Sequence, residues 1–153
     1  MAEFEHYGFT GTRKGMTGNQ KLRLDEFVKE LRGCVWHHGC CIGADAESHR
    51  IARVRGLSLH GHPPIQKHMM AEGLEYDALH GEAHFLARDR ILVDVTALLF
   101  AAPESFRQLN RNGGTWYTRS YALHIGRPVI TIYPDGTYTR EQNEPVQAAF
   151  RWS

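Results

Sequence analysis

Residues 35–45 of the chain, V-W-H-H-G-C-C-I-G-A-D, contain two histidines, two cysteines and an aspartate. Imidazole, thiolate and carboxylate groups are the common ligands of zinc, so this composition raises the question of a metal site. Zinc sites built from cysteine use pairs separated by roughly two to four residues, with a second pair elsewhere in the chain. Cys40 and Cys41 are adjacent, and no cysteine follows them. We therefore predict no metal site here and expect these cysteines to be small packing residues.

The other histidines are numerous, but their spacing matches no established zinc pattern. They include His60, His62, His68, His80 and His84. The chain as a whole is therefore predicted to hold no metal ion and no cofactor. The thiol of Cys40 or Cys41 is expected to be reactive only where it is exposed near a helix N-terminus, because such a position lowers the pKa of a thiol.

Three glycine-rich segments follow expected strands and precede expected helices. They are F-T-G-T-R-K-G (9–15), H-G-C-C-I-G (38–43) and N-G-G-T (112–115). At the carboxyl edge of an open α/β sheet, helix N-termini present unpaired N–H groups, and glycine lets the backbone approach an anion. None of the segments is a complete dinucleotide or P-loop fingerprint, and each alone has an ordinary steric explanation. Together they predict a phosphate-bearing ligand, specifically a nucleotide, that lies across the three turns.

Charged side chains in these turns have two interpretations each. Arg13 and Lys14 are either solvated loop residues or phosphate contacts, since guanidinium groups favour phosphate sites. Asp45 stands where a helix N-cap is expected, and capping is the simpler explanation for a carboxylate at that position. The same carboxylate oxygens could instead accept a hydrogen bond from a ribose hydroxyl.

The elements that would position these turns alternate between short apolar runs and segments with helical periodicity. Expected strands lie at 6–9, 34–37, 57–60, 97–102 and 129–133, and expected helices at 19–32, 46–55, 82–93 and between Gly114 and Gly126. Residues 61–81 show no clear period and are expected to form a long connection. The apolar run 97–102 lacks polar alternation, which is typical of a strand covered on both faces. This alternation predicts an α/β fold with a mostly parallel sheet of about five strands.

Length and charge narrow the class of protein. At 153 residues the chain has the size of one domain, expected over 1–153 with a core at about 5–134 and a peripheral tail at 135–153. Its 18 basic and 17 acidic residues give a net charge of +1, which provides no global attraction to nucleic acid or to a membrane. The three cysteines do not form a secreted disulfide framework, and neither a signal-peptide pattern nor a membrane-spanning run is visible. We expect a cytoplasmic protein.

Four segments together resemble one superfamily. They are F-T-G-T-R-K-G-M-T (9–17), H-H-G-C-C-I-G-A-D-A-E-S-H-R-I-A (37–52), F-L-A-R-D-R-I-L-V-D-V-T-A-L-L-F-A-A-P (85–103) and G-G-T-W-Y-T-R-S-Y-A-L-H-I-G-R-P-V-I-T-I-Y-P (113–134). Their order is similar to that of the SLOG superfamily, the Rossmann-like domains of the DNA-processing protein A (Smf) and LOG phosphoribohydrolase type. The similarity is closest to the DNA-processing branch. The resemblance implies a single three-layer Rossmann-like domain that binds a nucleotide or nucleotide derivative and forms homo-oligomers.

The resemblance also implies a pocket built from four places in the chain. The residues are Gly11, Thr12, Arg13, Gly39, Gly43, Asp45, Arg88, Asp89, Gly113, Gly114 and Thr115. The glycine-rich turns already point to three of these places, and the resemblance adds Arg88. Because Arg88 and Arg90 are two residues apart, they cannot share a helix face, so at most one is expected to point into the pocket. The resemblance favours Arg88.

Two departures from the superfamily pattern bear on catalysis. Asp89 replaces the asparagine that follows the arginine, which adds negative charge and suits a sugar hydroxyl or a base amino group. Thr118 replaces the glutamate that helps phosphoribohydrolases cleave the N-glycosidic bond, and threonine cannot act as a base near neutral pH. Asp45 and Asp89 are the catalytic candidates that remain. Glu47 and Glu82 are alternatives whose position the sequence does not give.

Three functions stay open. The sequence favours a sensor or sequestering module that binds a nucleotide or nucleotide derivative. The alternatives are a nucleoside monophosphate phosphoribohydrolase and a protein of the DNA-processing type that binds single-stranded nucleic acid. For the last, the candidate basic and aromatic patch consists of Arg107, Arg111, Trp116, Tyr117 and Arg119. Loop solubility and a partly buried aromatic pair explain these five residues more simply.

Overall fold

Among the residues that the structure describes, seven strands form one sheet in the order β4-β3-β2-β1-β5-β6-β7. This computed structural model describes residues 2–109, 113–145 and 150. The strands are β1 (His6–Gly11), β2 (Val35–His38), β3 (Ser58–Gly61), β4 (Ala78–Leu79), β5 (Leu98–Ala102), β6 (Val129–Ile132) and β7 (Tyr138–Glu141). Neighbouring strands from β4 to β6 run parallel, and β7 pairs antiparallel with β6.

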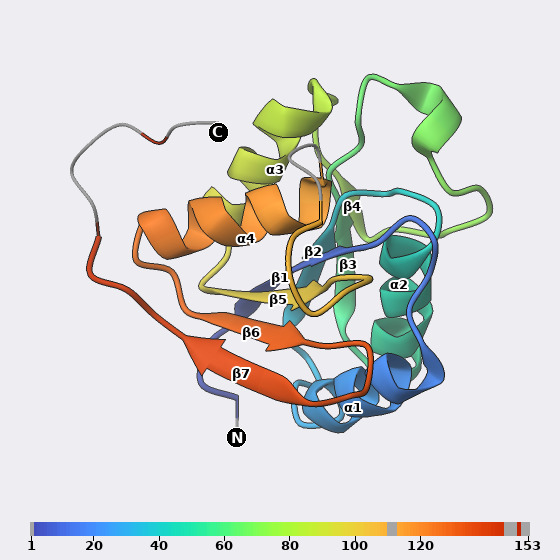
Figure 1. Ribbon diagram of the computed structural model, residues 1–153. Helices are drawn as coiled ribbons and strands as arrows, with labels where there is room; N and C mark the ends of the chain where they lie inside the picture. The colour runs from blue at the N-terminus through green and yellow to red at the C-terminus, as the bar shows by residue number, and fades with distance from the viewer. Residues whose placement is uncertain (1, 110–112, 146–149, 151–153) are drawn as a thin grey trace.

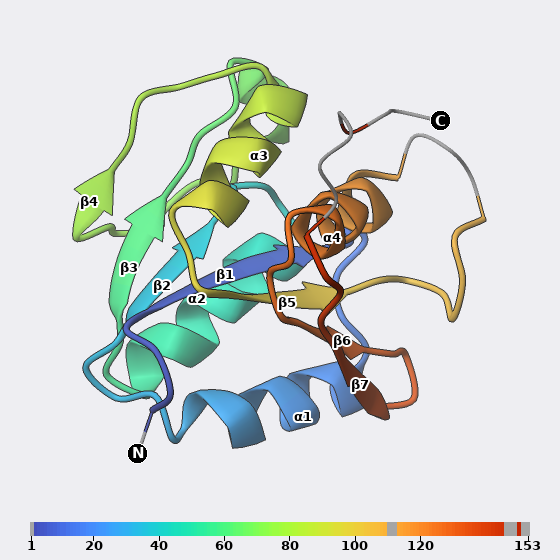
Figure 2. The same ribbon diagram turned by 90° about the vertical axis from the view of Figure 1, so that its left-hand side faces the viewer.

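Helices cover both faces of the sheet, which gives three layers (Figures 1 and 2). On one face lie α1 (Gly18–Val28) and α2 (Ala44–Val54), and on the other lie α3 (Phe85–Asp94) and α4 (Gly114–His124). A short 3-10 helix, η1 (Lys67–Met69), lies between β3 and β4. Phe100 of β5 packs in the core with α1 and α2, whereas Leu99 packs in the core with α3 and α4. Successive side chains of a strand point to opposite faces, so β5 is buried on both, as predicted.

The helices α1, α2 and α4 start in different ways at the carboxyl edge of the sheet. Thr17 begins α1 with a capping box, because its hydroxyl accepts a hydrogen bond from the Gln20 N–H and the Gln20 side chain accepts one from the Thr17 N–H. Gly43 and Gly113 precede α2 and α4, and neither provides a side-chain cap. The N-cap predicted at Asp45 is therefore wrong, since this residue lies inside the first turn of α2.

The predicted α/β fold with a mostly parallel sheet is confirmed, but the count of about five strands is too low. β4 has only two residues, too few to show a strand period within the expected connection. β7 lies in the segment expected to be a tail, and three of its four residues are exposed, so it lacks an apolar alternation. No helix in the described part of the chain is both long and apolar enough to cross a membrane.

Candidate ligand-binding site

A cavity of about 760 Å³ lies at the carboxyl edge of the sheet. Its wall consists of the turns after β1, β2 and β5, the first turns of α3 and the start of α4. Ten of the eleven residues predicted to bind a ligand line it: Gly11, Thr12, Arg13, Gly39, Asp45, Arg88, Asp89, Gly113, Gly114 and Thr115. The glycine-rich turns thus meet at one cavity, because the carboxyl ends of parallel strands share one edge of a sheet.

Arg88 forms the inner wall of the cavity and is only 6% exposed. Its Nε donates a hydrogen bond to Oδ1 of Asp89 at 2.7 Å, and its Nη1 donates to the carbonyl oxygens of Gly39 and His62. Although burial opposes the charge, the Asp89 carboxylate helps to raise the pKa of Arg88 above its ordinary value. Nη2 contacts Sγ of Cys41 at 3.8 Å, which is a weak hydrogen bond. Arg88 therefore holds together the cavity wall formed by α3 and the turn after β2.

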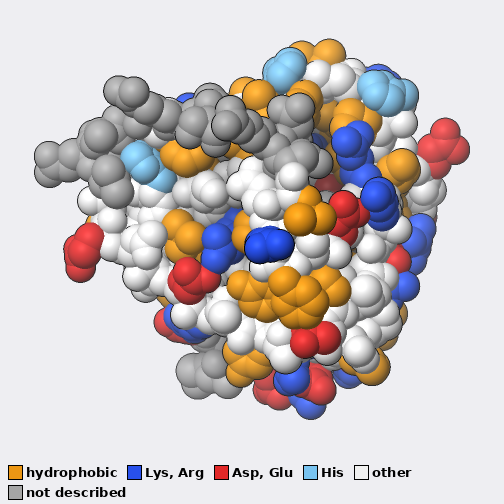
Figure 3. Space-filling model, in the orientation of Figure 1, with side chains coloured by type: hydrophobic (Ala, Val, Ile, Leu, Met, Phe, Trp, Pro, Cys, Tyr) orange, Lys and Arg blue, Asp and Glu red, His pale blue; other side chains and the backbone are white. Residues whose placement is uncertain are grey.

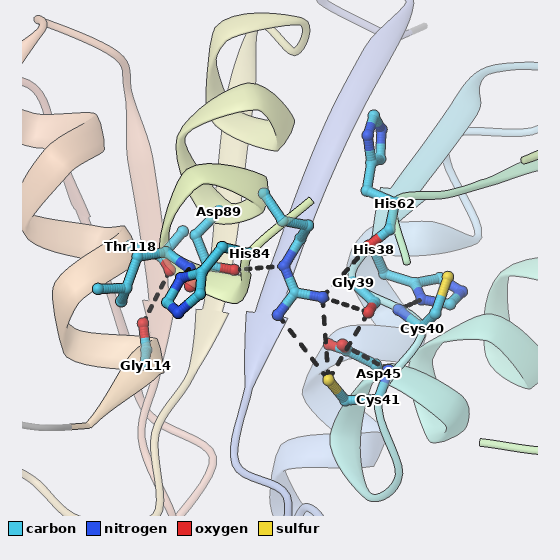
Figure 4. A network of polar contacts seen from close by, with 12 residues as sticks. His38, Gly39, Cys40, Cys41, Asp45, His62, His84, Asp89, Gly114 and Thr118 are labelled. Carbon is cyan, nitrogen blue, oxygen red and sulfur yellow. Dashed lines mark hydrogen bonds and ion pairs between the residues drawn. The ribbon is translucent and has the colours of Figure 1, made fainter. Parts of the chain in front are cut away.

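Asp45 lies beside this guanidinium group, next to Gly39 and Cys41 (Figure 4). Its Oδ2 accepts a hydrogen bond from the Cys41 N–H at 3.1 Å. Burial raises the pKa of Asp45 to about 7, although the charge of Arg88 acts to lower it. The carboxyl group therefore titrates near neutral pH, where its protonated form donates a hydrogen bond and its ionised form only accepts.

Asp89 lies on the other side of the network, near Thr118 and Gly114 (Figure 4). Burial raises the pKa of Asp89 above its ordinary value, while Arg88 and the Thr118 hydroxyl act to lower it. Thr118 also lines the cavity, and its hydroxyl donates to the Gly114 carbonyl at 2.8 Å. Thr118, where the sequence resemblance implies a glutamate in phosphoribohydrolases, therefore faces the cavity with a hydroxyl group.

The glycines of the site have different roles. A Cβ on Gly39 would lie 2.5 Å from Nη1 of Arg88, so the missing side chain lets the guanidinium pack on this turn. Gly43 lies outside the cavity wall; its φ is +83°, and a Cβ there would lie 2.2 Å from the Arg13 carbonyl oxygen. Gly43 therefore joins the first two turns. A Cβ on Gly114 would be 4.0 Å from Asp89, so this glycine leaves open space in the cavity.

The mouth of the cavity carries the cations. Arg13 and Lys14 are exposed there, and Lys14 forms an ion pair with Glu104 at 3.3 Å. The Thr12 hydroxyl accepts a hydrogen bond from the Lys14 N–H at 3.1 Å, and the Thr12 carbonyl accepts one from the Ala44 N–H at 2.9 Å. The first bond shapes the turn itself, and the second ties the turn to the start of α2. The site therefore has Arg13 and the Lys14–Glu104 ion pair at its mouth, and Arg88 between two carboxyl groups at its inner end.

Cys40 and Cys41 are buried and free of disulfide bonds. Burial raises the thiol pKa of Cys40 to about 11 and that of Cys41 to about 12, so neither is a reactive thiolate at neutral pH. Both pack in the interior, as expected. The contact of Cys41 with the Arg88 guanidinium was not foreseen, and no spacing in the sequence indicates it.

The other carboxylates considered for catalysis lie elsewhere. Glu47 accepts a hydrogen bond from the Met16 N–H at 2.6 Å and pairs with Lys21 at 2.8 Å. Glu82 forms an ion pair with Lys67. Neither Glu47 nor Glu82 lines the cavity. Asp45 and Asp89, which do line it, therefore remain the catalytic candidates.

Of the residues considered for nucleic-acid binding, Trp116, Tyr117 and Arg119 contact other side chains of the chain, whereas Arg107 is exposed. Arg119 forms an ion pair with Glu141, and Tyr117 is buried and accepts a hydrogen bond from Nε of Arg90 at 2.9 Å. Arg90 therefore points away from the cavity that Arg88 lines, as the helix geometry predicts. Arg111 lies outside the described residues. On the face shown in Figure 3, Lys and Arg side chains are interspersed with Asp and Glu.

No protein-family model and no curated protein matches the sequence. Solved structures match the fold. The molybdenum cofactor binding protein from Rippkaea orientalis superposes with a TM-score of 0.64 at 17% identity, over 87% of this chain and 78% of that one. The molybdenum cofactor carrier protein from Chlamydomonas reinhardtii has a TM-score of 0.60 at 18% identity, over 84% and 76%.

DNA processing protein A from Streptococcus pneumoniae superposes with a TM-score of 0.64 at 18% identity. The superposition covers 84% of this chain but only 50% of that protein. At such identities the likeness concerns the fold. The chain therefore shares a Rossmann-like α/β fold with these proteins.

Proposed function

We propose that the cavity binds a nucleotide or a nucleotide derivative, with its phosphate at the mouth and its sugar or base at the inner end. Arg13 and the start of α4 offer positive charge and N–H groups to a phosphate. Asp45 and Asp89 offer oxygens to hydroxyl or amino groups. The observation that carries the proposal is that one cavity of about 760 Å³ joins a cationic mouth to two buried carboxyl groups. This volume is within the usual range of small-molecule sites.

Names of the structurally similar proteins widen the set of ligands to test. Two of those proteins are named for binding or carrying the molybdenum cofactor, and one for processing DNA. From the four sequence segments, we propose that the chain is more similar to the DNA-processing branch than to the phosphoribohydrolase branch. Its charge of +1 and the ion pair of Arg119 favour a small ligand over a long single strand.

Asp45 supports a second candidate function. A carboxyl group with a pKa of about 7 beside a cavity is suited to general acid–base catalysis near neutral pH. The reaction would be hydrolysis of the N-glycosidic bond of a nucleoside monophosphate, with Asp45 or Asp89 in the role that Thr118 cannot fill.

The test is calorimetric titration of the protein with nucleoside mono-, di- and triphosphates, the molybdenum cofactor and a single-stranded oligonucleotide. The Arg13→Ala variant should bind the preferred phosphate ligand about 10- to 100-fold more weakly, because a charged hydrogen-bond partner is lost. Arg140→Ala is the matched control, since Arg140 is an arginine on β7 that pairs with Glu3 and does not line the cavity.

Chromatography of the same mixtures separates the candidate functions. Binding of a nucleotide without release of free base supports the binding module. Release of base that is abolished in Asp45→Asn or Asp89→Asn supports the hydrolase. Binding of the oligonucleotide that weakens steeply with salt supports the DNA-processing function. Equal affinities for Arg13→Ala and the native chain would contradict the proposed orientation of the phosphate.

A further inference from the structure

Five histidines gather on one part of the sheet, and none of them lines the ligand cavity. They are His6 of β1, His37 of β2, His60 of β3, and His62 and His80, which follow β3 and β4. We call these five residues the histidine cluster. Their spacing along the chain gave no metal pattern, because strand pairing brings them together from four separate segments.

The strand register puts the cluster on the face that faces away from α2. Trp36 points toward α2, where its Nε1 donates to the Ser48 hydroxyl at 3.1 Å. Since side chains alternate along a strand, His37 points to the opposite face. His37 is directly paired with His60 in the parallel register of β2 and β3. The two imidazoles therefore lie side by side, with ring centroids 4.8 Å apart.

Direct ring-to-ring contacts connect the cluster. Nδ1 of His37 lies 2.8 Å from Nε2 of His62, and Nε2 of His37 lies 2.8 Å from Nδ1 of His6. His62 stacks on His80 with centroids 4.2 Å apart and planes at 2°. Nδ1 of His60 lies 3.2 Å from Nε2 of His80. Every histidine of the cluster therefore contacts another imidazole.

Three of these rings converge on one point. His37, His62 and His80 each bring one ring nitrogen to within 4.8 Å of the other two. His37 and His62 are 2% exposed, whereas His80 is exposed. The convergence point is therefore anchored by two buried rings and reaches solvent through the third.

We propose that His37, His62 and His80 bind a divalent transition-metal ion of the zinc class. Imidazole nitrogens suit Zn²⁺, Co²⁺, Ni²⁺ and Cu²⁺, whereas Mg²⁺ and Ca²⁺ require oxygen ligands. Nδ1 of His37 and Nε2 of His62, which already face each other, turn toward the ion. Nε2 of His37 then keeps its proton and donates it to Nδ1 of His6, a bond of the kind that orients metal-binding imidazoles.

All three ligand nitrogens must shift to reach the geometry of a bound ion. Zn–N bonds of about 2.0–2.1 Å place neighbouring nitrogens of a tetrahedral site about 3.3 Å apart. The His37 and His62 nitrogens, now 2.8 Å apart, must therefore separate by about half an ångström. The three nitrogens now lie within 4.8 Å of one another, so the exposed His80 must move toward the ion, and a fourth position is left for a ligand from solvent. Water or a small anion completes the coordination there.

The experiment titrates the chain, prepared without a histidine tag, with Zn²⁺ in competition with a chromogenic chelator, and with Co²⁺ followed by its visible absorption. We expect one Zn²⁺ per chain and a Co²⁺ spectrum of low coordination number. His80→Ala should weaken Zn²⁺ binding at least about 100-fold, because loss of a direct ligand costs more than loss of its outer hydrogen-bond partner. His68→Ala, an exposed histidine in η1 outside the cluster, is the matched control and should bind like the native chain.

His80 is exposed, so its replacement is compatible with folding, which circular dichroism verifies. His62→Gln is the second variant and should lose Zn²⁺ binding as well. Zinc affinity that is unchanged in His80→Ala, or lost equally in His68→Ala, would overturn the proposal. Absence of stoichiometric binding would overturn it too and would identify the cluster as a hydrogen-bonded imidazole network.

Discussion

Asp45 and Asp89 are two buried carboxyl groups that flank one guanidinium group, that of Arg88. If both were ionised, the inner end of the cavity would carry a net negative charge next to the site proposed for a nucleotide. The raised pKa of Asp45, about 7, means that a proton removes this excess charge in mildly acidic solution. Arg88 thus balances one carboxylate, and the charge of the other depends on pH.

This raised pKa predicts how folding depends on pH. Between its ordinary pKa near 4 and its folded value of about 7, Asp45 binds a proton more tightly in the folded chain than in the unfolded chain. Its contribution to the free energy of unfolding is therefore full below pH 4 and is lost as the pH rises to 7. The asparagine of Asp45→Asn does not titrate, so the variant does not lose this free energy of unfolding as the pH rises. Relative to the native chain, the free energy of unfolding of the variant should therefore rise by up to about 4 kcal/mol between pH 4 and pH 7.

Urea unfolding of both proteins at a series of pH values measures this effect. The difference between the two curves isolates Asp45, because titration of the histidines is common to both proteins. A difference that stays constant from pH 4 to pH 8 would show that the pKa of Asp45 is not raised. Retention of the bond from the Cys41 N–H in the variant is expected, since the asparagine side-chain oxygen also accepts.

At the level of elements, the glycines at the starts of α2 and α4 have different roles: Gly43 precedes α2, and Gly114 is the first residue of α4. Gly43 has a φ of +83° and packs on the Arg13 carbonyl. Gly114 opens α4 with ordinary backbone angles and empty space around its Cα. One glycine is therefore required by the backbone, whereas the other leaves room for a ligand.

Two alanine substitutions separate these roles. Gly43→Ala should lower the free energy of unfolding by at least about 2 kcal/mol, because a side chain is strained at this φ and collides with the Arg13 carbonyl. Gly114→Ala should change it by less than about 1 kcal/mol, since alanine favours a helix. Its methyl group should nevertheless lower nucleotide affinity about tenfold, because it occupies cavity space beside Asp89. Urea unfolding and calorimetry measure the two effects, and unchanged affinity in Gly114→Ala would argue against a ligand at the start of α4.

Local sequence pattern was sufficient to predict the strands and helices that have a strong hydrophobic periodicity. The apolar run that forms β5, and the helical spacing that forms α1, could both be predicted, although α1 ends at Val28 rather than near residue 32. β4 and β7 could not, because one is too short and the other is an exposed edge strand that is held by pairing with β6. The glycine-rich turns predicted where the cavity lies, because glycine in these turns allows backbone conformations and close approaches that can be inferred from local sequence.

At the scale of the whole molecule, contacts between distant segments could not be predicted from local sequence pattern. Cys41 meets Arg88 across 47 residues, and His37 meets His62 across 25. The spacing of these residues in the sequence does not indicate the two contacts, because the contacts follow from the order of the strands in the sheet. The candidate cavity could be predicted from its turns, whereas the histidine cluster required the sheet topology.

His62 connects the histidine cluster to the wall of the ligand cavity. Its imidazole is part of the histidine cluster, and its carbonyl oxygen accepts a hydrogen bond from Nη1 of Arg88 at 3.2 Å. Any shift of this residue that accompanies metal binding is therefore transmitted to the cavity wall through a single peptide unit. Thermodynamic reciprocity then requires that Zn²⁺ change the affinity for nucleotide by the same factor as nucleotide changes the affinity for Zn²⁺.

Calorimetry of each ligand with and without the other measures this factor. We expect a factor of at least about five, the lower end of typical coupling between sites, and a factor of one in His80→Ala, in which the metal is lost. A factor of one in the native chain would show that the two sites are independent despite their shared residue. If the two sites are coupled, a metal ion bound to the histidine cluster on the face of the sheet would allosterically change the affinity for nucleotide at the edge of the sheet.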